Sequence, residues 1–305
     1  MNKRDTLLAK RTLLRERGDF VEADRIREEI EALGYHIADE NGRSFLIKKE
    51  AAREKPHGSI ALFGSGEISS IGRKIHEAVL SRLNKKNVTI AILTTPAGFQ
   101  PNVSLVHEEI ARFFQQSLAN FHPRVRIVMA NTPQEANSES VASQIDDTDY
   151  LFIGPGSPTY AVRILRGSLL YNRILDRILK GVSLGVASAA AIAFSKYVLP
   201  VYEIYKVGEP LHWIEGLNFY KQVFGELSVV PHFNNTEGGL KTDTSRCFMG
   251  ADRFSELLEL LPKNHTVWGI DELTGVIINV ETKSVAYQGK GKLHPLHGKR
   301  ANVAV

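Results

Sequence analysis

The chain has 305 residues, of which 43% are hydrophobic and 24% are charged, and its formal net charge is +4 at pH 7. This composition is that of an ordinary soluble globular protein with an ample core. No apolar run reaches the roughly 18 residues of a membrane-spanning helix, and the first residues lack the apolar stretch of a signal peptide. We therefore expect a cytoplasmic protein that makes no membrane contact.

Metal and nucleotide-cofactor chemistry find little support in the residue pattern. Cys247 is the single cysteine, which excludes an internal disulfide and a cysteine-rich metal site. The histidines lack the H-E-x-x-H and H-x-x-E-H spacings of zinc enzymes. Gly64 and Gly66 do not form a dinucleotide-binding fingerprint, because the spacing to the next glycine is wrong and no ribose-binding acid follows. We expect no cofactor and no catalytic metal.

Residues 1–48 are predicted to form a helical hairpin followed by a short β-hairpin. Apolar residues recur at helical spacing from Leu7 to Leu33, and Gly18 interrupts the pattern. Asn41-Gly42 lies between two strand-like runs, which is typical of a β-hairpin turn. The charged, irregular residues 49–57 are expected to be a linker.

Three pieces of this segment, Leu13–Phe20, Ala23–Arg27 and Ala32–Gly34, resemble the small C-terminal extension of cysteinyl-tRNA synthetases. The resemblance covers roughly the first 45 residues and implies an RNA-binding appendage. The basic residues that favour this interpretation are Lys3, Arg4, Lys10, Arg11, Arg15 and Arg17. Acidic residues on the second helix weaken that interpretation. The alternatives are a solvated helical pair that packs on the main domain and a hairpin that forms a homodimer.

From residue 58 to residue 290, strand-like runs alternate with helical patterns, with a single long helix expected over 159–180. Such alternation predicts an α/β domain with a mostly parallel sheet and helices on both faces, a three-layer sandwich. The basic residues 291–305 are expected to be a disordered tail. In open sheets of this kind, ligands bind beyond the carboxyl ends of the strands.

Ser188 lies where the buried run Gly181–Ala187 gives way to an alanine-rich helical pattern. A serine on a strand-to-helix turn presents its hydroxyl above the sheet edge, beside the backbone N–H groups of the helix start. The alternative is a small residue that allows close helix–sheet packing. Ser183 completes a literal G-x-S-x-G match, but the pattern places it within the strand, and we reject it as a nucleophile.

Two more polar residues follow strand-like runs, His232 after Leu227–Pro231 and Glu272 after Thr266–Asp271. Together with Ser188 they could form a nucleophile, a general base and an orienting carboxylate. A buried histidine and a loop carboxylate are the alternatives. The N–H groups of Gly156 and Ala189 are candidates for an oxyanion hole; a tight connection with proline at a helix start explains the Gly154–Pro158 stretch equally well.

Residues from about 58 to 290 resemble the peptidase family that contains dipeptidase E and cyanophycinase. The matching pieces are Phe63–Glu67, Gly154–Gly156, Ser188–Ala191, Pro231–Phe233 and Gly269–Glu272. The resemblance implies the class I glutamine amidotransferase-like fold and a serine peptidase with Ser188 as nucleophile, His232 as base and Glu272 as acid. It also implies cleavage beside aspartyl or isoaspartyl residues.

The chain departs from that pattern at Val186 and Ala190, which stand where the family's elbow motif has glycine. We expect the branched side chain of Val186 to crowd the turn. Glu209 is the alternative acid, because it precedes His232 as an aspartate does in the dipeptidase branch.

For the substrate, a small peptide or amide, Arg246 and Asn234 are the candidate binding residues. The competing interpretation is a catalytically relaxed family member that acts as a binding or RNA-associated protein.

Overall fold

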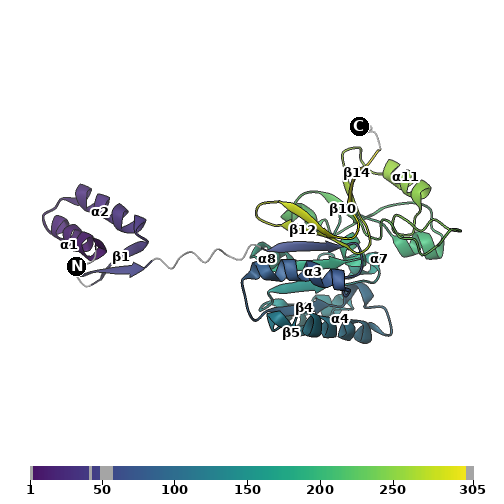
Figure 1. Ribbon diagram of the computed structural model, residues 1–305, viewed down its shortest axis with the longest axis horizontal. Helices are drawn as coiled ribbons and strands as arrows, with labels where there is room; N and C mark the ends of the chain where they lie inside the picture. The colour runs from purple at the N-terminus through teal and green to yellow at the C-terminus, as the bar shows by residue number, and fades with distance from the viewer. Residues whose placement is uncertain (1–2, 41–42, 49–57, 300–305) are drawn as a thin grey trace. The chain divides into compact units, whose positions relative to one another are not determined.

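The computed structural model describes residues 3–40, 43–48 and 58–299. The chain divides into two compact units, Met1–Lys55 and Pro56–Val305, and each is described by itself (Figure 1). The expected Asn41-Gly42 turn, the expected linker 49–57 and the last part of the expected tail lie outside the described residues.

The N-terminal unit contains the predicted helical hairpin and β-hairpin. Its elements are α1 (Lys3–Glu16), α2 (Phe20–Ala32), β1 (Tyr35–Glu40) and β2 (Arg43–Lys48). Asp19 caps α2 by accepting from the Glu22 N–H at 3.2 Å, and Gly18 takes a φ of +77° between the two helices, a conformation that glycine adopts without strain. The two strands pair antiparallel.

A buried arginine ties the two hairpins of this unit together. Arg11 on α1 is only 1% exposed. Its terminal nitrogens donate to both carboxylate oxygens of Asp39, at 3.1 and 2.9 Å, and to Ser44 Oγ at 3.3 Å. The hydrogen bonds from Arg11 and Ser44 hold the pKa of the Asp39 carboxyl well below its usual range. Arg11 is therefore a structural residue.

The second unit is built on a seven-stranded sheet. Its strands, in hydrogen-bonded order, are β13 (Val285–Gly289), β12 (Thr274–Asn279), β3 (Ser59–Phe63), β7 (Ser183–Ala187), β6 (Tyr150–Ile153), β4 (Thr89–Leu93) and β5 (Arg124–Val128). The strands from β3 to β5 run parallel, whereas β12 and β13 are antiparallel to their neighbours. The predicted three-layer α/β sandwich is confirmed.

Both faces of the parallel strands are buried, so their sequences are almost continuously apolar. On one face, Phe63, Ile92 and Phe152 pack with side chains of α3 (Ser70–Leu80) and α4 (Val103–Ser117). On the other face, Leu62 and Leu93 pack with residues of the helices α7 (Pro158–Leu165) and α8 (Leu169–Leu179). These two hydrophobic cores hold the sheet in place between the helices. The turns with the predicted polar residues follow the carboxyl ends of its strands.

A separate three-stranded sheet carries two of the predicted site residues. It has the order β10 (Leu227–Val230), β11 (Thr266–Ile270) and β14 (Leu293–His297). Strands β10 and β11 are parallel, and β14 pairs antiparallel with β11. The expected tail 291–305 is therefore wrong in its first part, because residues 293–297 complete a sheet. Basic composition misled the prediction, although the strand itself, Leu-His-Pro-Leu-His, contains no lysine or arginine.

The expected single helix over 159–180 is also wrong. It divides into α7 and α8, because Gly167 takes a φ of +67° and Ser168 caps α8 by accepting from the Tyr171 N–H. The remaining helices are α5 (Pro133–Ala136), α6 (Glu139–Ala142), α9 (Ala189–Ala193), α10 (Phe219–Val223) and α11 (Ala251–Glu259). Short 3-10 turns cover Ser81–Leu83, Thr95–Ala97, Ala119–Phe121 and Ser143–Ile145, a π-helix covers Glu203–Val207, and β8 (Tyr197–Val198) pairs with β9 (Ile214–Glu215).

Candidate active site

Ser188 occupies the predicted turn between β7 and α9. Its backbone has a φ of +50° and a ψ of −115°, a conformation that costs a non-glycine residue free energy and is concentrated at functional positions. The Ser188 hydroxyl makes no capping bond to α9. It is therefore free to bond elsewhere.

The residues before Ser188 explain how the turn fits into the sheet. Ser183 lies inside β7 and accepts from the Ser59 N–H at 3.1 Å, so the rejected G-x-S-x-G serine has a buried structural role. A Cβ on Gly185 would lie 2.0 Å from the Tyr150 hydroxyl oxygen. The Val186 side chain belongs to the hydrophobic core together with Ala190 and Ala191 of α9. The core thus accommodates its branched side chain, and its effect on the elbow stays a prediction.

The pairing of β10 with β11 brings His232 and Glu272 together. Val230 pairs with Gly269 in parallel register, so both strands end at the same edge and the two polar residues follow within three positions. His232 has a φ of +51°, and its N–H donates to the Gly64 carbonyl at 3.0 Å. This bond attaches the small sheet to the turn after β3 in the large one.

Ser188, His232 and Glu272 form one hydrogen-bonded chain. His232 Nδ1 lies 3.0 Å from Glu272 Oε1, and His232 Nε2 lies 3.0 Å from Ser188 Oγ. A carboxylate only accepts, so we assign the imidazole hydrogen to Nδ1, which leaves Nε2 to accept the Ser188 hydroxyl hydrogen. This tautomer is the one that a general base for Ser188 requires.

Two asparagines form hydrogen bonds with Glu272, one with its carboxylate and one with its backbone. Asn235 Nδ2 donates to Glu272 Oε1 at 3.1 Å, and Asn234 Oδ1 accepts from the Glu272 N–H at 2.7 Å. The hydrogen bond from His232 keeps the pKa of the Glu272 carboxyl below its ordinary value, although burial acts in the opposite direction. Glu272 is therefore ionised at neutral pH and can stabilise a positive charge on the imidazole.

The turn after β3 packs against the residues on either side of Glu272. A Cβ on Gly64 would lie 2.0 Å from the Asp271 carbonyl oxygen, and Ser65 Oγ accepts from the Leu273 N–H at 3.0 Å. Burial lowers the pKa of His76 to about 3, so the ring is neutral. Its Nε2 then donates to the Glu67 carbonyl at 3.1 Å and its Nδ1 accepts from Tyr150. Burial also raises the pKa of the Glu67 carboxyl.

A cavity of about 180 Å³ surrounds Ser188. Gly156, Ala189 and His232 are among its lining residues. In the described part of the chain, neither the Gly156 N–H nor the Ala189 N–H donates to a protein acceptor. A Cβ on Gly156 would lie 2.0 Å from the Pro96 carbonyl oxygen, so only glycine fits there. The two predicted oxyanion-hole residues thus share the Ser188 cavity.

Three other predicted residues, Arg246, Asn234 and Glu209, are not among those that line the Ser188 cavity. Arg246 places its guanidinium 4.7 Å from the centroid of the Phe233 ring and lines neither of the two cavities described for this unit, nor does Asn234. The alternative acid Glu209 lies 3.7 Å from His212, and Glu272 is the carboxylate that contacts His232. The cation that lines the Ser188 cavity is Lys206.

Cys247 also lines the Ser188 cavity. It is buried, and burial raises the pKa of its thiol to about 12, so the reactive thiolate is scarce at neutral pH. Among the residues described, no cluster of histidine, cysteine and carboxylate side chains suits a metal ion, and no helix is long and apolar enough to cross a membrane.

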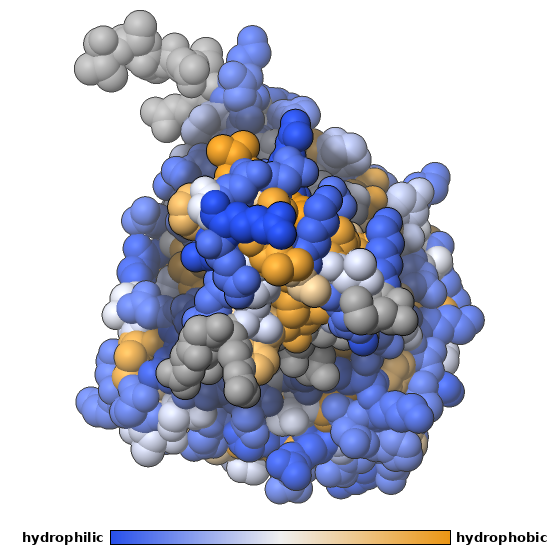
Figure 2. All heavy atoms as spheres, turned by 90° about the vertical axis from the view of Figure 1, so that its left-hand side faces the viewer, coloured by the Kyte–Doolittle hydropathy of each residue, from blue (hydrophilic) through white to orange (hydrophobic). Residues whose placement is uncertain are grey.

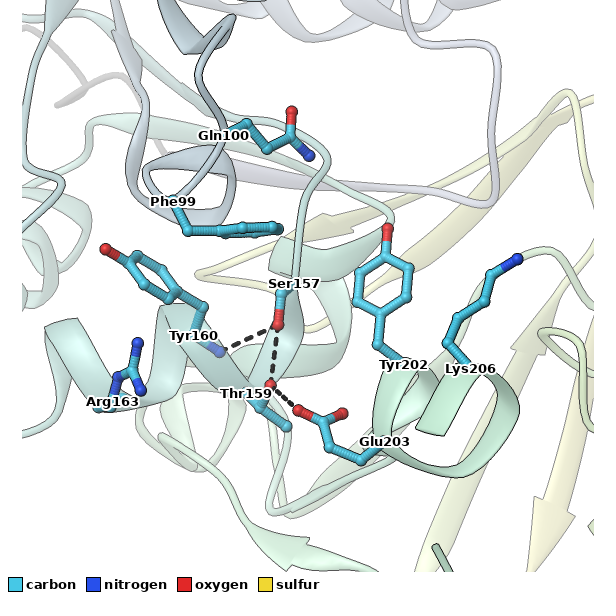
Figure 3. A pocket seen from close by; sticks show the side chains of 9 residues that line it. All are labelled: Phe99, Gln100, Ser157, Thr159, Tyr160, Arg163, Tyr202, Glu203 and Lys206. Atoms are coloured by element: carbon cyan, nitrogen blue, oxygen red, sulfur yellow. Dashed lines mark hydrogen bonds between the residues drawn. The ribbon is translucent and has the colours of Figure 1, made fainter. Parts of the chain in front are cut away.

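Sequence reasoning missed a larger cavity beside the first. Its volume is about 740 Å³, and its lining residues are Phe99, Gln100, Ser157, Thr159, Tyr160, Arg163, Tyr202, Glu203 and Lys206 (Figure 3). Tyr202 and Lys206 line both cavities. Phe99 and Gln100 lie in the segment that follows the carboxyl end of β4, and this position after a strand could have indicated a binding site. The contribution of the π-helix Glu203–Val207 has no comparable signature.

Comparison with solved structures supports the fold. A peptidase from an acI-B1 Actinobacterium matches with a TM-score of 0.64 and 21% identity, over 80% of this chain and 93% of that one. A candidate peptidase E protein from Listeria monocytogenes EGD-e matches with a TM-score of 0.53 and 15% identity, over 77% and 99% of the two chains. No family model and no curated protein matches the chain. The chain therefore has the peptidase E-like fold, whereas the synthetase-like character of residues 1–45 stays a prediction.

Proposed function

We propose that the chain is a serine hydrolase that cleaves a small peptide or amide bond through an acyl-enzyme. The observation that carries the proposal is the unbroken hydrogen-bonded chain from Glu272 through His232 to Ser188. Ser188 shares its cavity with Gly156 and Ala189, whose N–H groups have no acceptor among the described residues. The fold shared with two peptidases supports the reaction class.

In this mechanism, Ser188 Oγ attacks the carbonyl carbon while His232 Nε2 takes its proton. The negative charge that develops on the carbonyl oxygen is stabilised by the N–H groups of Gly156 and Ala189. His232 then gives its proton to the leaving amine, the carbon–nitrogen bond breaks, and a water molecule activated by His232 releases the acid. Glu272 keeps the imidazole oriented throughout.

The preference for aspartyl or isoaspartyl bonds remains part of the proposal and rests on the sequence resemblance. A carboxylate on the substrate requires a cation near the scissile bond, and Lys206 is the lysine that lines the Ser188 cavity. Lys206 replaces Arg246 and Asn234 as the candidate for this contact.

The test is hydrolysis of α- and β-aspartyl dipeptides, other dipeptides and glutamine, by the wild type and by Ser188→Ala. We expect turnover of aspartyl substrates that disappears in the variant while its melting curve is unchanged. Equal turnover by the two proteins would contradict the proposal.

The RNA-associated alternative is weakened by the N-terminal unit itself. Of the six basic residues named in support of RNA binding, Arg11 and Arg15 contact Asp39, and Arg4 contacts Asp5 and Tyr35. Exposed apolar side chains such as Phe20 and Phe45 share its surface, and Figure 2 shows apolar patches among the hydrophilic side chains on the face viewed. No observation therefore favours RNA binding over a protein-packing role.

A further inference from the structure

The larger cavity lies next to the place where the Ser188 reaction would release its leaving group. The two cavities share Tyr202 and Lys206, and Gly156 of the smaller one precedes Ser157 of the larger one. A volume of about 180 Å³ holds little more than the scissile bond and a small side chain, whereas about 740 Å³ falls in the range of sites for whole small molecules. A substrate that fills both cavities has a sizeable second part.

One hydrogen-bond acceptor in the larger cavity, a carboxylate oxygen of Glu203, receives no hydrogen bond from the described residues. Thr159 Oγ1 donates to Glu203 Oε1 at 2.5 Å and lies 2.8 Å from Ser157 Oγ, which in turn accepts from the Tyr160 N–H. Glu203 Oε2 is buried and has no partner among the described residues. Because a buried acceptor without a hydrogen bond is costly, the bound molecule is expected to supply a donor there.

The walls of the cavity are aromatic. The rings of Phe99 and Tyr160 pack with centroids 5.3 Å apart, and the Tyr202 ring stands on the opposite side of Ser157 in Figure 3. The side chains of Phe99 and Tyr202 are 48% and 40% exposed. An aromatic face left open to a cavity, such as that of Phe99, suits a flat ring that stacks on it.

The rim is positively charged. Arg163 and Lys206 line the cavity with Glu203 as the single carboxylate among its lining residues, and within the described residues neither cation forms an ion pair. Their cationic groups lie over the rings of Tyr160 and Tyr205 instead. A basic amino acid such as arginine or lysine could place a donor on Glu203 and its carboxylate beside a cation, but it carries no aromatic ring to stack on Phe99. A ligand with a donor at its flat end and an anion at its other end satisfies Glu203, the walls and the rim.

We propose that this cavity binds a nucleotide whose base carries an exocyclic amino group, as the leaving group of an acyl-nucleotide substrate. The inference rests on the proposed function of Ser188. The base stacks on Phe99, its amino group donates to Glu203 Oε2, and its phosphate contacts Arg163, whereas Lys206, which lines both cavities, faces the acyl part. Ser188 Oγ then forms a bond to the acyl carbon, and the ester or amide bond to the nucleotide breaks. The departing oxygen or nitrogen takes the proton from His232, and water later hydrolyses the acyl-enzyme.

The test measures binding of the free nucleotides by calorimetry to the Ser188→Ala protein, so that it does not depend on turnover. Adenosine monophosphate offers an amino group where uridine monophosphate offers a carbonyl oxygen, so we expect the first to bind about tenfold or more tightly. Glu203→Gln should reverse this order. The carbonyl oxygen of the new amide would accept from Thr159, which turns the amide NH₂ group toward the base as a donor. A variant that keeps the wild-type order would overturn the proposal.

Two further variants locate the phosphate and the stacking contacts. Arg163→Met should weaken the binding of adenosine monophosphate about tenfold and leave the binding of adenosine unchanged. Arg166 is an exposed cation that pairs with Glu215 outside the cavity, so Arg166→Met should change the binding of neither ligand. Phe99→Ala should weaken both about tenfold. No binding to a protein with a normal melting curve, or tighter binding of free arginine than of adenosine monophosphate, would contradict the proposal. Ser188-dependent hydrolysis of aspartyl dipeptides together with either result would preserve the serine hydrolase and discard the nucleotide.

Discussion

The buried Arg11 of the N-terminal unit and the polar groups around Ser188 in the α/β unit are arranged in opposite ways. In the first unit, Arg11 is buried and donates to Asp39 and Ser44, so its charge connects α1 with the β-hairpin of the same unit. In the second, Ser188 adopts a strained backbone and the N–H groups of Gly156 and Ala189 find no protein acceptor in the described residues. Polar groups that bond one another stabilise the fold, whereas groups left open beside a cavity are available to a ligand.

Removal of the Ser188 hydroxyl should have the largest effect. Ser188→Ala is expected to lower kcat/KM by about 10⁴-fold or more, because no other group replaces the nucleophile. Ser183→Ala is the matched control. It removes the acceptor of the buried Ser59 N–H, so it should lower the free energy of unfolding by about 1–3 kcal/mol and leave activity per folded molecule intact. Loss of activity in Ser183→Ala, together with retained activity in Ser188→Ala, would refute the assignment.

The carboxylate comes next. Glu272→Gln should lower kcat by about 10³- to 10⁴-fold with little change in KM, because a neutral amide no longer stabilises the imidazolium or fixes its tautomer. The assay is steady-state hydrolysis of the best dipeptide. Glu209→Gln, which removes an exposed carboxylate paired only loosely with His212, should leave kcat unchanged; a large loss there instead would restore Glu209 as the acid.

In the N-terminal unit the expected effect is on stability. Asp39→Asn leaves Arg11 buried without its counter-ion, and because Asp39 is 45% exposed on its side chain, we expect a loss of about 1–2 kcal/mol. Hydrogen exchange of α1 and α2 in the full chain measures it, and kcat/KM should not change. Asp24→Asn, an exposed neighbour on α2, is the control.

The same pair predicts a pH dependence. The folded state lowers the pKa of Asp39 from its ordinary value of 3.8, so this stabilisation is present above pH 3.8 and is lost as the pH falls toward the lower folded value. Hydrogen exchange in α1, corrected for its intrinsic rate, should therefore accelerate below about pH 4 in the wild type and show a smaller change in Asp39→Asn. Identical profiles would contradict the assignment.

The smallest effect is expected at Cys247. Because burial raises the pKa of its thiol to about 12, iodoacetamide should modify it slowly at neutral pH. Cys247→Ala should retain activity within about tenfold, since it removes one lining side chain and no reacting group. Loss of activity comparable with that of Ser188→Ala would indicate a cysteine nucleophile.

Strand ends and turn residues were readable from the sequence because they follow local rules. The elbow at Ser188, the parallel register behind His232 and Glu272, and the break at Gly18 are fixed within a few residues by strand burial and glycine conformation. The larger cavity was not predictable in this way. Phe99, Tyr160 and Tyr202 meet through tertiary packing, and the open oxygen of Glu203 depends on its bond with Thr159. Strand β14 was missed for a related reason, because only its pairing with β11 defines it.

The most direct test of the central claim is labelling with a fluorophosphonate, which reacts with activated serines, followed by mass spectrometry of the digested protein. The account predicts a single adduct on Ser188 in the wild type, and none in His232→Ala, whose serine lacks a base. An adduct on Ser183 or on another residue, or an unlabelled Ser188 in the folded wild-type protein, would contradict it.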